Sequence, residues 1–117
     1  MTALTKYQRV LNVKLDDSGY PGEEMIIFAN PPGVVMDGFW EVAGEGQMRA
    51  FLLQHGLILK TSFEADDGSP LALDVLPWDV YPIATAALVD EVLRVRRAIN
   101  AAAERRTADA NDTPKIG

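Results

Sequence analysis

Apolar residues recur at helical spacing through much of the second half of the chain. Steps of four or three residues separate Val80, Ala84, Leu88, Val92, Val95 and Ile99. Residues at this spacing share one face of an α-helix. Asp79 can cap the start, and Pro82 is tolerated in a first turn, where its missing N–H has no intrahelical partner. The stretch therefore predicts one long amphipathic helix.

Extended chain is predicted in three other segments. Residues 7–15 and 23–30 are rich in apolar and β-branched side chains, and a turn-forming stretch, 16–22, separates them. This order predicts an antiparallel hairpin with a long loop. Residues 57–63 alternate with period two. The face expected to cover a core holds Leu57, Leu59, Thr61 and Phe63, and the opposite face holds Ile58, Lys60 and Ser62.

The segments between the expected strands contain strong breaks. Pro31-Pro32-Gly33 interrupts the chain, and residues 34–36 are expected to form a short strand or an extended crossing. Residues 37–40 match no pattern. A helix is predicted from Glu45, with Gly56 as its left-handed cap. Residues 64–70 predict a turn, and 71–77 a short return segment or a single helical turn.

These elements together predict an α+β fold. It consists of a small antiparallel sheet from the N-terminal strands, a central helix and the long C-terminal amphipathic helix. The 117 residues and the 48% apolar content are those of one globular domain. We expect a single domain over residues 1–106 and a disordered tail over residues 107–117.

The charge balance limits the kind of partner. Seventeen acidic residues against eleven basic ones give a net charge of -6. Such a chain is a poor match for the phosphates of nucleic acid or for an anionic membrane surface. No apolar run is long enough for a membrane span, and the N-terminus has no signal-peptide core. We therefore expect a cytoplasmic protein whose partner is another protein, with no nucleic acid and no membrane.

Residue types that support catalysis are scarce. The chain has one histidine and no cysteine. His55 falls in the last turn of the predicted central helix, where a histidine commonly bonds to free carbonyls. Asp16-Asp17 and Asp66-Asp67 lie in expected turns, where aspartate bonds to nearby backbone. We therefore expect no enzyme activity, no metal and no cofactor.

Aromatic residues beside proline or glycine have two interpretations. Trp40, Trp78, Tyr20 and Tyr81 can fill a small core, or they can form contacts with a partner. Core packing is the default for Trp78, and both interpretations stay open for Trp40. The candidate protein-binding residues come from these aromatics and the helical stripe: they are Trp40, Trp78, Tyr81, Leu88, Val92 and Val95.

Residues 57–97 resemble the small tail assembly chaperones of siphophages. The matching features are a strand ending in Phe63, the turn Asp66-Asp67-Gly68-Ser69-Pro70-Leu71, and Leu76-Pro77 before an apolar helix. The tryptophan that often precedes the acidic turn in that group is absent here. The resemblance implies a non-enzymatic phage protein that works in the host cytoplasm. It would bind the long, hydrophobic, helical tape-measure protein during virion assembly.

Other functions use the same kind of scaffold. A structural tail-completion or head–tail joining protein would assemble into rings, and self-association is compatible with the sequence. An acidic regulatory or inhibitor module would align its carboxylates on one surface to mimic nucleic acid. The acidic residues here are instead scattered among the expected turns.

Overall fold

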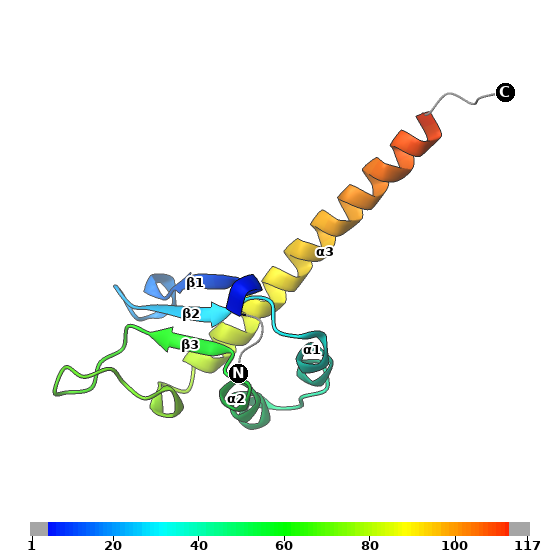
Figure 1. The fold of residues 1–117 in the computed structure, drawn as a ribbon. Coiled ribbons are helices and arrows are strands. Elements are labelled where there is room, and N and C mark those ends of the chain that lie inside the picture. The colour runs from blue at the N-terminus through cyan, green and yellow to red at the C-terminus, as the bar shows by residue number, and fades with distance from the viewer. Residues whose placement is uncertain (1–4, 113–117) are drawn as a thin grey trace.

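A computed structural model describes residues 5–112 of the chain and the side chains of residues 6–107. The α+β prediction is confirmed: a three-stranded antiparallel sheet from the N-terminal half lies beside three α-helices, and the last helix is by far the longest (Figure 1). Among the described residues there are also three short 3-10 turns: η1 (Thr5–Tyr7) precedes the sheet, η2 (Asp16–Ser18) lies between the first two strands, and η3 (Leu73–Val75) precedes the last helix.

The sheet has the strand order β1-β2-β3. Strands β1 (Val10–Lys14) and β2 (Glu24–Phe28) form the predicted hairpin. Its loop is held by Asp16, whose Oδ1 accepts the backbone N–H of Gly22 at 2.6 Å. Strand β3 (Ile58–Thr61) pairs antiparallel with the other edge of β2.

The predicted facing of β3 is wrong at its first two residues. The pairing register between β2 and β3 shifts between Ile26 and Ile27. Such an irregularity adds a residue to one strand and turns its side chains. Ile58, expected to face outward, is therefore 2% exposed, whereas Leu59, expected in the core, is 37% exposed.

The expected strand over residues 34–36 is also wrong. These residues belong to helix α1 (Gly33–Phe39), and Trp40 is its C-terminal cap. Pro32 precedes the helix, at a position where a missing N–H costs no intrahelical bond. Because the segment is helical, only one side of it faces the core: Phe39 is buried, whereas Val34 is 78% exposed.

Helix α2 (Glu45–Gln54) matches the predicted central helix. Gly56 has φ +62°, the left-handed conformation expected of a C-terminal cap. The N–H of Leu57 then bonds to the carbonyl of Leu52 at 2.9 Å, which turns the chain directly into β3.

Helix α3 (Val80–Asp112) has two parts with different surroundings. Its first turns cross one face of the sheet and pack beside α2, and the rest projects away from the other elements (Figure 1). The molecule therefore measures 75 × 29 × 28 Å. The helix continues past Arg106, where we expected it to end, and residues 113–117 of the expected tail lie outside the described residues.

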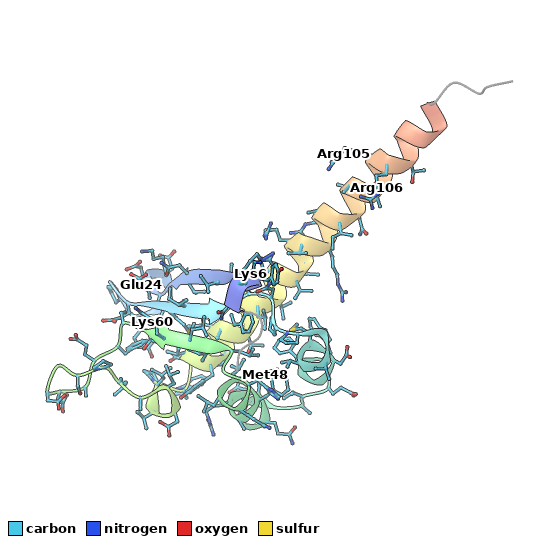
Figure 2. The ribbon with its side chains drawn as sticks, viewed as in Figure 1. Lys6, Glu24, Met48, Lys60, Arg105 and Arg106 are labelled. Atoms are coloured by element: carbon cyan, nitrogen blue, oxygen red, sulfur yellow. The ribbon has the colours of Figure 1, made fainter. Side chains whose placement is uncertain are left out.

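The core lies between the sheet and the start of α3. Met25 and Ile27 of β2 face Val80 and Leu88 of α3 in one cluster of buried side chains, together with Leu52 of α2. The other face of the sheet is mixed in character, because it carries charged residues as well as Val10, which is 53% exposed. Lys14 Nζ lies 3.8 Å from Glu24 Oε2, and Figure 2 shows Glu24 and Lys60 on this side of the sheet. Within residues 5–112, no helix has the length and apolarity that crossing a membrane requires.

Candidate functional site

An open, mainly apolar groove of about 390 Å³ lies between the start of α2 and the first turns of α3. We call it the α2–α3 groove. Met48, Trp78, Tyr81 and Pro82 contribute much of its apolar lining, and Glu45 and Arg49 add one charge of each sign. Clefts of about 300–1,000 Å³ are typical of sites that take a ligand or an anchoring side chain. The groove is therefore the first candidate for a binding site.

Trp78 stands at the entrance to α3 and is 68% exposed, so the prediction that it packs in the core is wrong. Its neighbours Leu76 and Val80 take the buried positions instead. The Tyr81 hydroxyl fixes this short segment, because it donates to the carbonyl of Leu73 at 2.7 Å and accepts the N–H of Leu76 at 3.2 Å. The indole is thereby left on the rim of the α2–α3 groove.

Tyr81 forms part of the floor of the groove, and its side chain is not exposed for contact with a partner. Only 3% of its surface is exposed, and its hydroxyl is already bonded. The Arg49 guanidinium lies over the Tyr81 ring, 5.8 Å from the centroid, within the range of a cation–π contact. This contact joins α2 to α3 across the groove.

The structure separates the other sequence-predicted binding residues. Leu88 is 2% exposed and belongs to the core. The prediction that it contacts a partner is therefore wrong. Trp40 is half-exposed at the end of α1, where its ring packs edge-on against Phe39 at 4.9 Å between centroids. Val92 and Val95 lie half-buried on the projecting part of α3. Only Trp78 and Tyr81 share the groove.

Sequence reasoning missed several groove residues. Pro82 and Thr85 were not named as binding residues, although they lie four and seven residues after Trp78 and share a face of α3 beside the buried stripe. That spacing was a usable signal. Met48 on α2 was recognised as helical, but nothing in the sequence indicated that α2 would lie next to α3.

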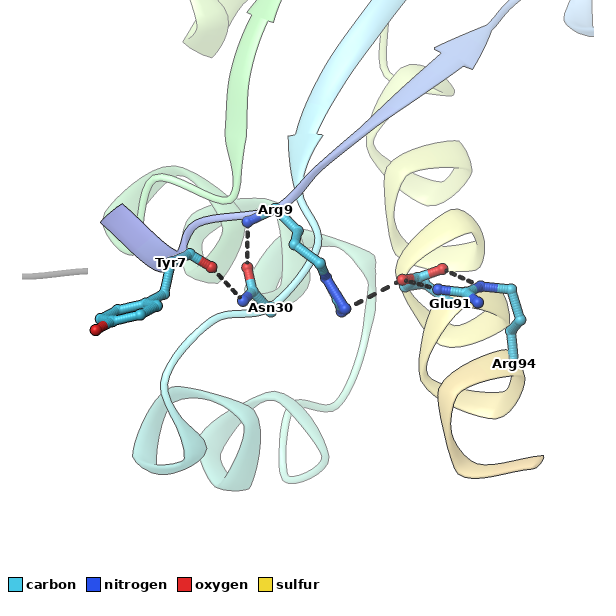
Figure 3. A network of polar contacts seen from close by, with 5 residues as sticks. All are labelled: Tyr7, Arg9, Asn30, Glu91 and Arg94. Carbon is cyan, nitrogen blue, oxygen red and sulfur yellow. Dashed lines mark hydrogen bonds and ion pairs between the residues drawn. The ribbon is translucent and has the colours of Figure 1, made fainter. Parts of the chain in front are cut away.

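A second polar cluster surrounds Glu91, a buried charged residue of α3 (Figure 3). Its two carboxylate oxygens each accept a 2.8 Å hydrogen bond from the Arg94 guanidinium, and Arg9 Nη2 lies 3.4 Å from Oε2. The hydrogen bonds from Arg94 are the main reason that the pKa of Glu91 is lower than usual.

The same cluster ties the N-terminal segment to α3. The backbone N–H of Arg9 donates to Asn30 Oδ1 at 2.7 Å, and Asn30 Nδ2 donates to the carbonyl of Tyr7 at 2.9 Å (Figure 3). Among the described residues, no buried side-chain nitrogen or oxygen lacks a hydrogen-bond partner. We therefore assign the cluster to holding the fold together at the point where α3 leaves the core.

The other titratable groups considered from the sequence have local structural roles. Asp67 Oδ1 accepts the N–H and the hydroxyl of Ser69 at 3.0 and 2.6 Å, and these bonds lower the pKa of Asp67. His55 follows α2 and packs against the ring of Phe51 at 4.3 Å between centroids. Over the described part of the chain, no group of three or more acidic, histidine or cysteine residues is arranged to hold a metal ion.

Comparison of the chain with protein-family models, with curated proteins and with solved structures found no match.

Proposed function

We propose that this chain is a non-enzymatic assembly chaperone of a phage tail, which binds apolar helical segments of the tape-measure protein. The observation that carries the proposal is the α2–α3 groove with the indole of Trp78 exposed on its rim. The resemblance of residues 57–97 to siphophage tail assembly chaperones supplies the identity of the client.

The groove suits the apolar face of a helix. Its walls are two helices, and its apolar surface comes from flexible Met48, the ring of Pro82 and the large face of Trp78. An amphipathic helix binds such a groove by inserting side chains spaced three or four residues apart. Methionine adapts to differently shaped side chains, and tryptophan is enriched among the residues that contribute most to binding, which suits a client with many similar segments.

The acidity of the rest of the molecule supports the same role. Residues 1–91 hold five basic and fourteen acidic residues, a net charge of -9. A bound apolar client would thus be surrounded by like-charged protein surfaces, which repel one another and keep the complex dispersed. A chaperone for a long hydrophobic chain requires this combination of apolar binding and surface repulsion.

Binding to fluorescent peptides that tile the tape-measure protein of the same phage would test the proposal. We expect apolar amphipathic segments to bind the full chain, and Trp78→Ala to weaken that binding at least tenfold. Trp40→Ala is the matched control, because Trp40 is half-exposed but does not line the groove. Absence of binding to every segment, or equal binding by the Trp78→Ala variant, would overturn the proposal.

A further inference from the structure

The projecting part of α3, residues 92–107, forms a helical arm (Figure 1). We call residues 5–91 the head. The exposure of the apolar stripe changes along the helix: Leu88, in the head, is 2% exposed, and Ile99, in the arm, is 57% exposed. The same pattern that buries the first turns of α3 thus continues on the arm, where Val92 and Val95 are half-buried and Ile99 is mostly exposed.

The spacing on the arm is that of a helix–helix seam. From Leu88 the apolar positions are Val92, Val95, Ile99 and Ala102, at steps of four, three, four and three. Because the steps alternate between four and three, all of these residues lie along the line where two helices meet in a coiled coil. A short helix without tertiary contacts is only marginally stable in water, so a partner along this seam would stabilise the arm.

The arm and the head carry opposite charge. The arm holds five arginines and one glutamate, a net charge of +4, whereas residues 1–91 have a net charge of -9. Arg105 and Arg106 lie near the far end of the arm (Figure 2). Attraction between the basic arm of one copy and the acidic head of another therefore favours an arrangement in which each arm reaches the other copy's head.

The charges on the face opposite the seam do not favour nucleic acid. Helical spacing places Arg94 and Arg97 there, but Asp90 and Glu104 lie on the same face. Acidic residues within the row would repel phosphates. This face has the mixed composition of a solvated helix surface.

We propose that the arm binds the arm of a second copy of this chain, with the two helices antiparallel. With Val95 beside Ile99 of the second copy, Val92 meets Ala102 at both ends of the contact. Each arm tip, with Arg105 and Arg106, then lies beside the start of the other arm, where the acidic head of that copy begins. A parallel pair would instead place the two basic tips together and away from both acidic heads, which is unfavourable.

Sedimentation velocity of the full chain over a concentration series tests whether the pair forms. We expect a monomer–dimer equilibrium, and the double substitution Val95→Glu with Ile99→Glu should raise the dissociation constant at least tenfold. The control adds the same charges to the opposite face, as Asn100→Glu with Ala101→Glu. Far-UV circular dichroism verifies that both variants keep their helix.

Disulfide trapping tests the orientation, because the chain has no cysteine of its own. A mixture of the Val92→Cys and Ala102→Cys variants should form a mixed disulfide, and neither variant should cross-link with itself. In a parallel pair each variant would cross-link with itself, which would overturn the antiparallel arrangement. A folded protein that stays monomeric at several hundred micromolar would overturn self-association.

These outcomes are independent of the proposed function, since Val95 and Ile99 do not line the α2–α3 groove. A seam variant that is monomeric but still binds tape-measure peptides would support both proposals. Loss of dimerisation by the opposite-face control to the same degree as by the seam variant would show that added charge, and not the seam, controls association.

Discussion

The Tyr20 hydroxyl donates a 2.6 Å hydrogen bond to Oδ1 of Asp79, which joins the β1–β2 loop to the residue before α3. The Tyr20 ring also packs edge-on against Phe63, the residue that follows β3 closely, at 5.3 Å between centroids. Segments from three parts of the sequence therefore meet at one tyrosine. The contact fixes where α3 begins and, with it, the position of the neighbouring Trp78.

Removal of this hydroxyl should destabilise the fold. We expect Tyr20→Phe to lower the melting temperature by a few degrees, because Asp79 loses its donor while the ring contact with Phe63 is kept. Tyr7→Phe is the control, since Tyr7 is 66% exposed. The melting temperature of this variant should match that of the wild type. Equal melting temperatures for all three proteins would contradict the assigned role of the bond.

Replacement of two leucines of α3 by alanine should have different effects on stability, because one leucine is packed in the core and the other is exposed. Leu88→Ala should lower the free energy of unfolding by about 2–5 kcal/mol, because it leaves a cavity among buried side chains. Leu93→Ala, at a residue that is 46% exposed, should cost less than about 1 kcal/mol. Urea unfolding followed by circular dichroism measures both, and a similar loss for the two variants would contradict the observed boundary.

The Glu91 cluster should make stability depend on pH. Hydrogen bonds from Arg94 lower the pKa of Glu91 in the folded state, so the carboxylate stabilises the fold above its unfolded pKa of 4.5. That contribution is lost as the pH falls through 4.5 and then through the lower folded pKa. Glu91→Gln should therefore be less stable than the wild type at pH 7, by about 1–3 kcal/mol.

Urea unfolding at several pH values between 7 and 3 tests this dependence. The stability of the Glu91→Gln variant should approach that of the wild type as the pH is lowered. Glu41→Gln, at an exposed glutamate, should keep the wild-type pH profile. A constant gap between the wild type and Glu91→Gln over the whole range would show that the ion pair does not contribute through its charge.

Two helical glycines should respond differently to the same substitution. A Cβ on Gly46 would meet nothing within 4 Å, so Gly46→Ala should stabilise α2 by about 0.5–1 kcal/mol. A Cβ on Gly38 would lie 3.1 Å from Cε2 of Phe51, where α1 packs against α2. Gly38→Ala should therefore lower the free energy of unfolding despite its better helix propensity. Thermal unfolding of both variants compares them, and an equal gain would rule out a close fit at Gly38.

Local chemistry explains which elements were predictable. The β1–β2 hairpin follows from two apolar runs around a dense turn, and the end of α2 follows from Gly56, whose left-handed φ suits glycine best. The run Val34-Val35-Met36 was mistaken for extended chain because β-branched residues favour strands. Burial of Phe39 against the core selects the helix instead.

The features that the sequence did not predict depend on tertiary contacts. The irregular pairing of β2 with β3 exchanges the environments of Ile58 and Leu59, and no pattern in β3 itself indicates it. The apolar stripe of α3 predicted the helix correctly, but it could not indicate that packing stops near Glu91. Trp78 was misplaced for the same reason, because the exposure of a residue at a helix start depends on which neighbours the core takes.

The unbroken helix α3 holds the end of the arm at a fixed distance from the head. From Ile83 to the end of the described helix there is no glycine or proline, so the backbone offers no hinge between head and arm. At 1.5 Å per residue, Thr107 is held about 24 Å along the axis from Glu91. The end of the arm is thus held at a fixed distance from the α2–α3 groove, so molecules bound at these two places would be kept apart by the length of the helix.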